Sequence, residues 1–203
     1  MIATRTVDPY VEPITLDEVK DHLRITFNSH DSQLLGLITA SREFVESVTG
    51  RALVQQTWKY YLQNWPAGNE FELPFPPLRS VTSIKYTDSD GTQTTWEDTT
   101  TSPTSYDYEV DTDSEPGRII LAYGETWPST TLHPKNPIEI EFVAGYDDDG
   151  ESPPDYQVNI PEGIKNAMKL DIEIRYNRPN DAYVKTLEDV RDTLLAPYKV
   201  WRF

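Results

Sequence analysis

The sequence predicts an α+β protein, in which a helical domain formed by both chain ends carries an inserted antiparallel β domain, either a sandwich or a small barrel. Apolar residues recur with a helical period before Gly50 and after Pro161, and with a period of two between these positions. The central strand candidates are short and separated by Pro, Gly and Asp, which is typical of antiparallel sandwiches and barrels. The predicted helical domain comprises residues 1–52 and 160–197, and the β domain comprises residues 53–159.

Two helices are predicted in the N-terminal part. Thr15 and Glu18 form a capping-box pair, in which each side chain pairs with an otherwise unsatisfied backbone donor of the first turn. A second helix follows, with Ser29 or Asp31 as its N-cap and Gly50 just past its C-terminal end. The apolar stripes that define these helices are Leu16, Val19 and Leu23 in the first, and Leu34, Leu37, Ile38, Val45 and Val48 in the second.

Strands are predicted in the centre of the chain. From Leu53 alternate side chains share one face, which predicts a long, half-buried strand. Asp90 and Gly91 predict a hairpin, because that turn type requires positive φ. Further strands are expected at residues 70–73, 80–86, 92–96, 106–110, 118–122 and 137–143.

Two more helices are predicted after the strands. The third begins at Pro161, a favoured first helical position, and ends before Pro179, which forbids its continuation. The fourth begins at Thr186, with Asp189 in the capping position, and Pro197 closes it. A short tail that is aromatic and cationic then ends the chain.

The composition excludes several classes of protein. Without cysteine, the chain forms no disulfide, no thiolate zinc site and no Cys nucleophile. The N-terminus lacks the apolar segment of a signal peptide, and apolar stretches such as residues 34–38 are far shorter than the roughly 20 residues that cross a bilayer. We therefore expect a protein that is made and used in a cytosol and has no membrane contact.

The acidic charge is concentrated in the middle of the chain. The net charge is −16, and residues 88–159 hold 17 Asp and Glu against only Arg118 and Lys135. A surface this negative repels phosphate backbones, so tight nucleic-acid binding there is disfavoured. A solubilising surface is the simplest interpretation of this charge.

No enzymatic site is predicted. The three histidines are widely separated, and no catalytic triad or phosphate loop is present. Glu139 and Glu141 have a spacing compatible with a glycosidase pair, yet alternating Glu on the solvent side of a strand is the commoner explanation.

Metal binding is not predicted either. Residues 111–115 and 147–151 offer the oxygen ligands that calcium takes, but neither segment has the full twelve-residue loop pattern. Plain acidic turns are expected, and no cofactor is assigned.

One candidate function is that of a carbohydrate- or protein-binding β module of a phage or bacterial surface structure. It is suggested by aromatic residues in predicted strands, although these more often form a core than a sugar-binding surface. The residues concerned are Trp58, Tyr60, Tyr61, Trp65 and Trp96.

Several motifs occur in a fixed order along the chain. They include Pro13-Ile14-Thr15-Leu16-Asp17-Glu18, Thr49-Gly50-Arg51-Ala52-Leu53, Gln56-Thr57-Trp58, Pro76-Pro77-Leu78, Asp90-Gly91, Ile160-Pro161 and Leu195-Ala196-Pro197-Tyr198. In this order they resemble the head-tail connector proteins (head completion or adaptor proteins) of tailed bacteriophages. The resemblance covers roughly residues 12–91 and 160–203, whereas residues 92–159 match weakly.

The resemblance implies a structural virion protein that is made in the host cytoplasm. Such proteins assemble as a ring under the portal protein in the virion neck. A ring with the same number of subunits as the portal would have about twelve. The ring extends the DNA channel, retains packaged DNA and provides a platform for the tail or for a stopper or neck protein. Double-stranded DNA would pass through without specific binding.

The C-terminal tail is the candidate portal-docking element. Pro197 releases the chain from its helix just before three aromatic and two cationic residues, which are typical interface anchors. The alternative is that Trp201 and Phe203 fold back onto the subunit's own core. The candidate docking residues are Tyr198, Lys199, Val200, Trp201, Arg202 and Phe203.

Part of the acidic segment is the candidate lining of the DNA channel. A repulsive wall keeps a passing duplex from sticking, whereas a place on the outer rim would leave only the solubilising role. The candidate lining residues are Asp147, Asp148, Asp149 and Glu151.

Overall fold

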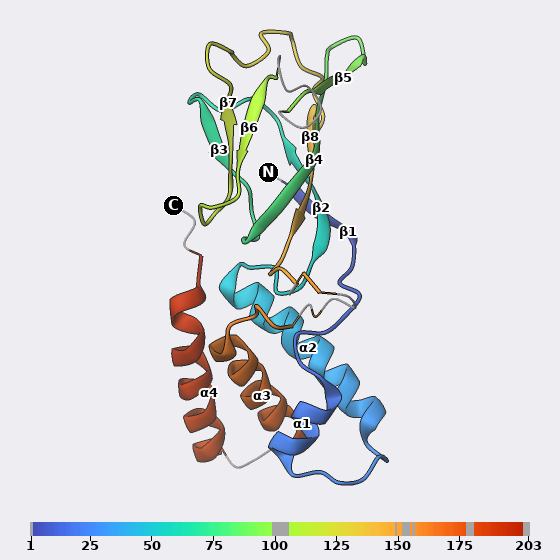
Figure 1. Cartoon of the computed structure of the whole chain (residues 1–203), viewed down its shortest axis with the longest axis vertical. Helices are drawn as coiled ribbons and strands as arrows, with labels where there is room; N and C mark the ends of the chain where they lie inside the picture. The colour runs from blue at the N-terminus through green and yellow to red at the C-terminus, as the bar shows by residue number, and fades with distance from the viewer. Residues whose placement is uncertain are drawn as a thin grey trace. The chain divides into compact units, whose positions relative to one another are not determined.

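The chain divides into two compact units in a computed structural model, which describes residues 2–98, 106–148, 150–151, 155, 157–177 and 181–200 (Figure 1). A β unit comprises Met1–Asp8 and Gln55–Gly145, and a helical unit comprises Pro9–Val54 and Tyr146–Phe203. The helical unit is therefore built from segments on both sides of the β unit. The predicted α+β class, with an antiparallel β domain inserted into a helical one, is confirmed.

The β unit contains two antiparallel sheets, and neither closes into a barrel within the described residues. The larger sheet has the strand order β1-β2-β8-β4-β5, and the smaller has the order β3-β7-β6. The strands of the larger sheet are β1 Ile2–Val7, β2 Gln56–Leu62, β8 Ile138–Ala144, β4 Leu78–Thr87 and β5 Gln93–Trp96. Those of the smaller sheet are β3 Glu70–Glu72, β7 Arg118–Leu121 and β6 Tyr108–Asp111.

The alternation expected for a half-buried strand is clearest in β8. Ile138, Ile140 and Phe142 are fully buried, whereas Glu139 and Glu141 on the opposite face are only half-buried. Gly117, at the turn before β7, lets this turn approach β4, because a Cβ atom there would overlap the side chain of Leu78.

Strand β1 is an element that the sequence pattern does not predict. The predicted helical domain begins at residue 1, whereas the structure places Ile2–Val7 at the edge of the larger sheet, antiparallel to β2. Every side chain of β1 is exposed or half-buried, so no apolar alternation marks it as a strand. Residues 53–54 and 146–159, expected in the β domain, belong to the helical unit.

The described part of the helical unit contains four α-helices and a short 3₁₀ helix. They are α1 Leu16–Leu23, α2 Asp31–Thr49, α3 Glu162–Asn177, α4 Asp181–Leu195 and η1 Ala196–Tyr198. None of these helices is both long enough and apolar enough to cross a membrane.

The helix ends follow the predicted capping chemistry only in part. The capping box of Thr15 and Glu18 is present, and Gly50 ends α2 with a φ of 73°. His30, and not Ser29 or Asp31, occupies the N-cap of α2 and makes no side-chain capping bond. Helix α4 begins at Asp181 and not at residue 186, because its first turns carry exposed side chains that hide the apolar period.

Helices from before and after the β unit share one core. Leu34, Ile38 and Val45 of α2 are buried in the same cluster as Ile164 and Met168 of α3. The hydroxyl of Ser41 donates a hydrogen bond to the carbonyl oxygen of Met168 at 3.2 Å, and Figure 1 shows α3 alongside α2. The two ends of the chain thus stabilise each other.

A buried ion pair joins α4 to this core. The carboxylate of Asp171, whose side chain is 2% exposed, accepts hydrogen bonds from Arg175 Nε at 2.7 Å and Arg191 Nη1 at 3.0 Å. The guanidinium of Arg191 also lies 4.6 Å from the ring centroid of Phe44 in α2. Arg191 of α4 therefore links the buried carboxylate of α3 to the aromatic ring of α2.

Candidate assembly surfaces

The first residues of the C-terminal tail lie on the helical unit. The carbonyl oxygen of Tyr198 accepts a hydrogen bond from Arg51 Nε at 2.7 Å, and the amide of Val200 donates to the carbonyl oxygen of Thr49 at 2.8 Å. The ring of Tyr198 lies so close to Gly163 that a Cβ atom there would be 3.0 Å from it. Tyr198, Lys199 and Val200 are accordingly half-buried.

This anchoring divides the candidate docking segment. Its first half is held at the C-terminal end of α2 and the start of α3, whereas Trp201, Arg202 and Phe203 lie outside the described residues. Sequence reasoning missed the contribution of Arg51 and Gly163 to this anchor. A glycine in the first turn of α3 is the only signal of close approach by another segment.

In the acidic turn after β8, two carboxylates accept hydrogen bonds from backbone amides of the same turn. Asp147 Oδ1 accepts from the amide of Asp148 at 3.0 Å, and Asp148 Oδ1 accepts from the amide of Gly150 at 3.0 Å. Asn159 Nδ2 donates to the carbonyl oxygen of Asp148 at 2.8 Å, which ties the turn to the segment before α3. Asp147 and Glu151 are exposed and Asp148 is half-buried; Asp149 lies outside the described residues.

The other acidic turn, between β6 and β7, is an internal ion-paired cluster. Asp111 Oδ2 accepts hydrogen bonds from Ser114 Oγ at 2.6 Å and from Arg118 Nη2 at 2.9 Å. These bonds, from Ser114 first and then from Arg118, lower the pKa of Asp111 to about 2. Within the described residues, no group of three or more potential ligands is placed to hold a metal ion.

The carboxylates considered as a catalytic pair belong to a surface ion-pair network. Glu139 and Glu141 both approach the ammonium group of Lys59, with oxygen–nitrogen distances of 2.8 and 3.6 Å. The hydroxyl of Tyr61 donates to Glu139 at 3.2 Å. These contacts pair both carboxylates with side chains of β2, as expected for Glu on the solvent side of a sheet.

The three histidines lie at separate places. His22 Nε2 is 3.0 Å from Glu173, and His30 Nδ1 is 2.6 Å from the hydroxyl of Tyr176. His133 Nδ1 contacts the backbone of Lys135. They are not brought together into one site.

The aromatic side chains of the β unit pack mainly against one another. Trp65, Trp96 and Trp127 stack mutually, with ring centroids 4.8 to 5.3 Å apart. Trp58 stacks on Phe75 at 4.1 Å, and Tyr60 is buried. This arrangement is that of a core and not of an open sugar-binding surface.

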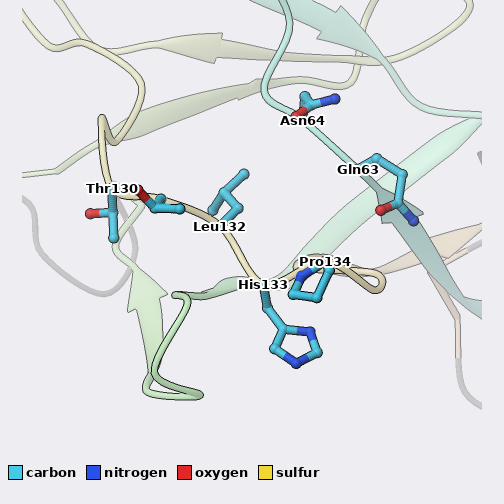
Figure 2. A pocket seen from close by; sticks show the side chains of 7 residues that line it. Gln63, Asn64, Thr130, Leu132, His133 and Pro134 are labelled. Atoms are coloured by element: carbon cyan, nitrogen blue, oxygen red, sulfur yellow. The ribbon is translucent and has the colours of Figure 1, made fainter.

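An open depression lies near one end of the larger sheet (Figure 2). It has a volume of about 400 Å³ and is lined by Gln63 and Asn64, just after β2, and by residues 130–134, which precede β8. Figure 2 shows Leu132 between Thr130 and Gln63, with the ring of His133 pointing away. Sequence reasoning missed this feature, because irregular segments that meet only in the fold carry no periodic signal.

Comparison with known proteins connects the chain to a family. Residues 13–113 match the sequence model of a family described as "Phage gp6-like head-tail connector protein". No curated protein sequence gives a significant match to the chain.

Solved structures share the whole fold. One is a chain from "Neck of empty GTA particle computed with C6 symmetry", with a TM-score of 0.77 and 21% identity over 100% of this chain and 97% of the other. Two others, from "Virion of native gene transfer agent (GTA) particle" and "Neck of native GTA particle computed with C12 symmetry", each have a TM-score of 0.73 and 20% identity over the same shares. At this identity the likeness establishes the fold, and the sequence match supplies the family. The chain belongs to the phage gp6-like head-tail connector protein family.

Proposed function

We propose that this chain is a structural subunit of a ring in the neck of a phage-like particle, between the portal and the tail. There the ring extends the DNA channel, retains packaged DNA and provides the platform for tail attachment. The observation that carries the proposal is the family match over residues 13–113, joined to a fold shared over the whole chain with neck components of GTA particles. A role without catalysis belongs to this proposal and is supported by the separate positions of the three histidines.

A ring of about twelve subunits is part of the proposal, and it is supported by the C12 symmetry named for one related neck. Light scattering or native mass spectrometry would measure the mass of the free protein, and then its mass after mixing with portal rings. We expect one ring of this chain per portal ring. A protein that stays monomeric alone, with portal rings and with DNA-filled heads would contradict the proposal.

We also propose that the end of the tail, residues 201–203, docks into the portal. Support comes from the anchoring of Tyr198 and Val200, which fixes the point on the helical unit at which residues 201–203 begin. Aromatic and Arg side chains supply most of the truncation cost in protein interfaces, often about 2 kcal/mol or more each.

Truncation separates docking from folding. Deletion of residues 201–203 leaves both anchoring hydrogen bonds intact, so we expect an unchanged Tm and a loss of portal attachment. Tyr198→Ala is the matched control, because it removes packing within the helical unit and is expected to lower the Tm. A truncated chain with a lowered Tm and normal attachment would assign residues 201–203 to the subunit's own core.

The acidic turn after β8 is our proposed contribution to the channel wall. The exposed carboxylates of Asp147 and Glu151 support this role, because a negative wall repels the phosphate backbone. A cryo-EM reconstruction of the ring on the portal tests it. We expect residues 147–151 on the inner wall, and a position on the outer rim would leave them only a solubilising role.

A further inference from the structure

Tyr123 is a fully exposed aromatic residue on a well-anchored loop. Its exposure reaches 104% of the reference value, and its side chain makes no hydrogen bond or ring contact with any described residue. The flanking residues are fixed, since the amide of Ala122 donates to the carbonyl oxygen of Asp107 at 3.0 Å and Trp127 Nε1 donates to that of Gly68 at 2.6 Å. The loop therefore presents one unpartnered phenol ring at a defined place on the β unit.

The depression in Figure 2 has the chemistry that a tyrosine side chain needs. Leu132 and Pro134 provide apolar surface, and the amides of Gln63 and Asn64 provide hydrogen-bonding groups for a phenol hydroxyl. Its wall is held by backbone bonds, because the amide of Ser89 donates to the carbonyl oxygen of Thr131 at 2.9 Å. Tyr123 belongs to the same β unit as the depression but is not among the residues that line it.

Electrostatics favours a second copy of the chain at these two patches. The β unit holds 15 acidic against 6 basic residues, a net charge of −9, so most of its surface repels another copy. None of the residues that line the depression is acidic, and the side chain of Tyr123 is a phenol and not a carboxylate. A depression without carboxylates is therefore a place where a second acidic subunit meets less like-charge repulsion.

We propose that Tyr123 of one subunit inserts into the depression of the next subunit around the ring. The inference rests on the proposed ring function, and it names the contact that closes the ring. A closed ring needs a heterologous interface, in which two different patches of each subunit meet. A protruding aromatic residue and a depression without acidic side chains, both on the β unit, provide such a pair of patches.

Disulfide trapping tests the contact directly, because the natural chain contains no cysteine. In the double variant Y123C/N64C, assembled as the ring and mildly oxidised, we expect covalent oligomers that extend up to the full ring. The matched control T112C/N64C places the first thiol at the exposed turn between β6 and β7, at the opposite end of β7 from residue 123. This control should give no such ladder.

A second measurement tests how much Tyr123 contributes to the stability of the assembled ring. Tyr123→Ala should raise the protein concentration at the assembly midpoint at least about tenfold, as expected for loss of a buried aromatic anchor. Tyr123→Phe should retain most of the assembly. The Tm of the isolated subunit should not change in either variant, because Tyr123 has no contact to lose within the described residues.

The outcomes separate this inference from the proposed function. If wild-type chain forms rings while Y123C/N64C gives no ladder and Tyr123→Ala assembles normally, the contact is wrong and the ring function stands. If wild-type chain forms no ring, alone or with portal rings, both the contact and the ring function are overturned.

Discussion

The two units are stabilised by different kinds of interaction. In the helical unit, charged side chains are buried: those of Asp171 and Arg42 are 2% and 5% exposed, and each pairs with residues from another segment. In the β unit the ion pairs, such as that of Lys59 with Glu139, lie on the sheet surface, and the interior is mainly apolar and aromatic. We infer that buried charge pairs specify how the distant segments of the helical unit align.

Arg42 illustrates this alignment at the N-terminal side. Its guanidinium donates to Glu12 at 2.8 Å and to Glu46 at 3.1 Å, and Glu46 in turn accepts the amide of Leu53 at 3.1 Å. One side chain of α2 thereby fixes the segment that enters the helical unit and the segment that leaves it. The β unit is almost continuous in sequence and needs no comparable device.

Spectroscopy can follow the two units separately. Four of the five tryptophans lie in the β unit, at positions 58, 65, 96 and 127, so tryptophan fluorescence reports mainly on this unit. Circular dichroism at the helical band reports mainly on the helical unit. A Trp201→Phe background removes the remaining tryptophan from the fluorescence signal.

The largest effect is expected from Asp171→Ala. This change leaves Arg191 and Arg175 without their shared carboxylate, and removal of one partner of a buried ion pair costs about 3–5 kcal/mol. Denaturant unfolding followed by circular dichroism should show the loss in the helical unit, with little change in tryptophan fluorescence.

Glu139→Ala is the matched control for this prediction. It removes a carboxylate from a partly exposed pair with Lys59, for which about 0.2–1 kcal/mol is typical. If Asp171→Ala and Glu139→Ala destabilise their units equally, the contrast between buried and surface charge is wrong.

An intermediate effect is expected from Gly117→Ala in the β unit. The added Cβ meets the side chain of Leu78, and overpacking of this kind costs about 1–3 kcal/mol. The loss of stability should appear in unfolding followed by tryptophan fluorescence and not in the helical band of circular dichroism.

The double variant with Gly117→Ala and Leu78→Ala should lose less free energy of unfolding than the sum of the two single changes, because the truncated side chain leaves room for the new methyl group. Additive effects would show that the two positions do not meet.

The sequence predicts regular elements better than the contacts between them. Helix α2 and strand β8 carry clear apolar periods, and their ends are close to the predicted ones. Strand β1 buries no side chain, and the first turns of α4 carry an exposed Tyr183, so neither start shows a periodic signal. Periodicity reveals burial and therefore misses elements that bury little.

The candidate assembly surfaces are likewise only partly predictable from the sequence. The aromatic and cationic tail is visible in the sequence, but its anchoring by Arg51 and Gly163 depends on residues more than thirty positions away, which no local pattern connects. The depression near Leu132 likewise joins segments after β2 and before β8. Such sites are produced by the topology and not by local sequence.

The smallest effect is expected for the surface ion pair of Asp111, and it depends on pH. The hydrogen bond from Ser114 and the pairing with Arg118 lower the pKa of Asp111 from 3.8 to about 2, so the folded β unit favours the charged carboxylate. A carboxylate with a lowered folded pKa stabilises the protein above its ordinary pKa, and this contribution is lost as the pH falls through the folded pKa. Wild type should therefore exceed Asp111→Asn in stability above about pH 4, and the two should converge as the pH approaches about 2. Denaturant unfolding followed by tryptophan fluorescence between these pH values measures the difference in stability.

Arg118→Met should shift the pH at which the two stabilities converge to a higher value, because it removes one of the groups that lower the pKa of Asp111. A stability difference that does not change between pH 2 and pH 7 would show that Asp111 is not held as a charged partner, and the ordering of buried over surface pairs would then rest on Asp171 and Glu139 alone.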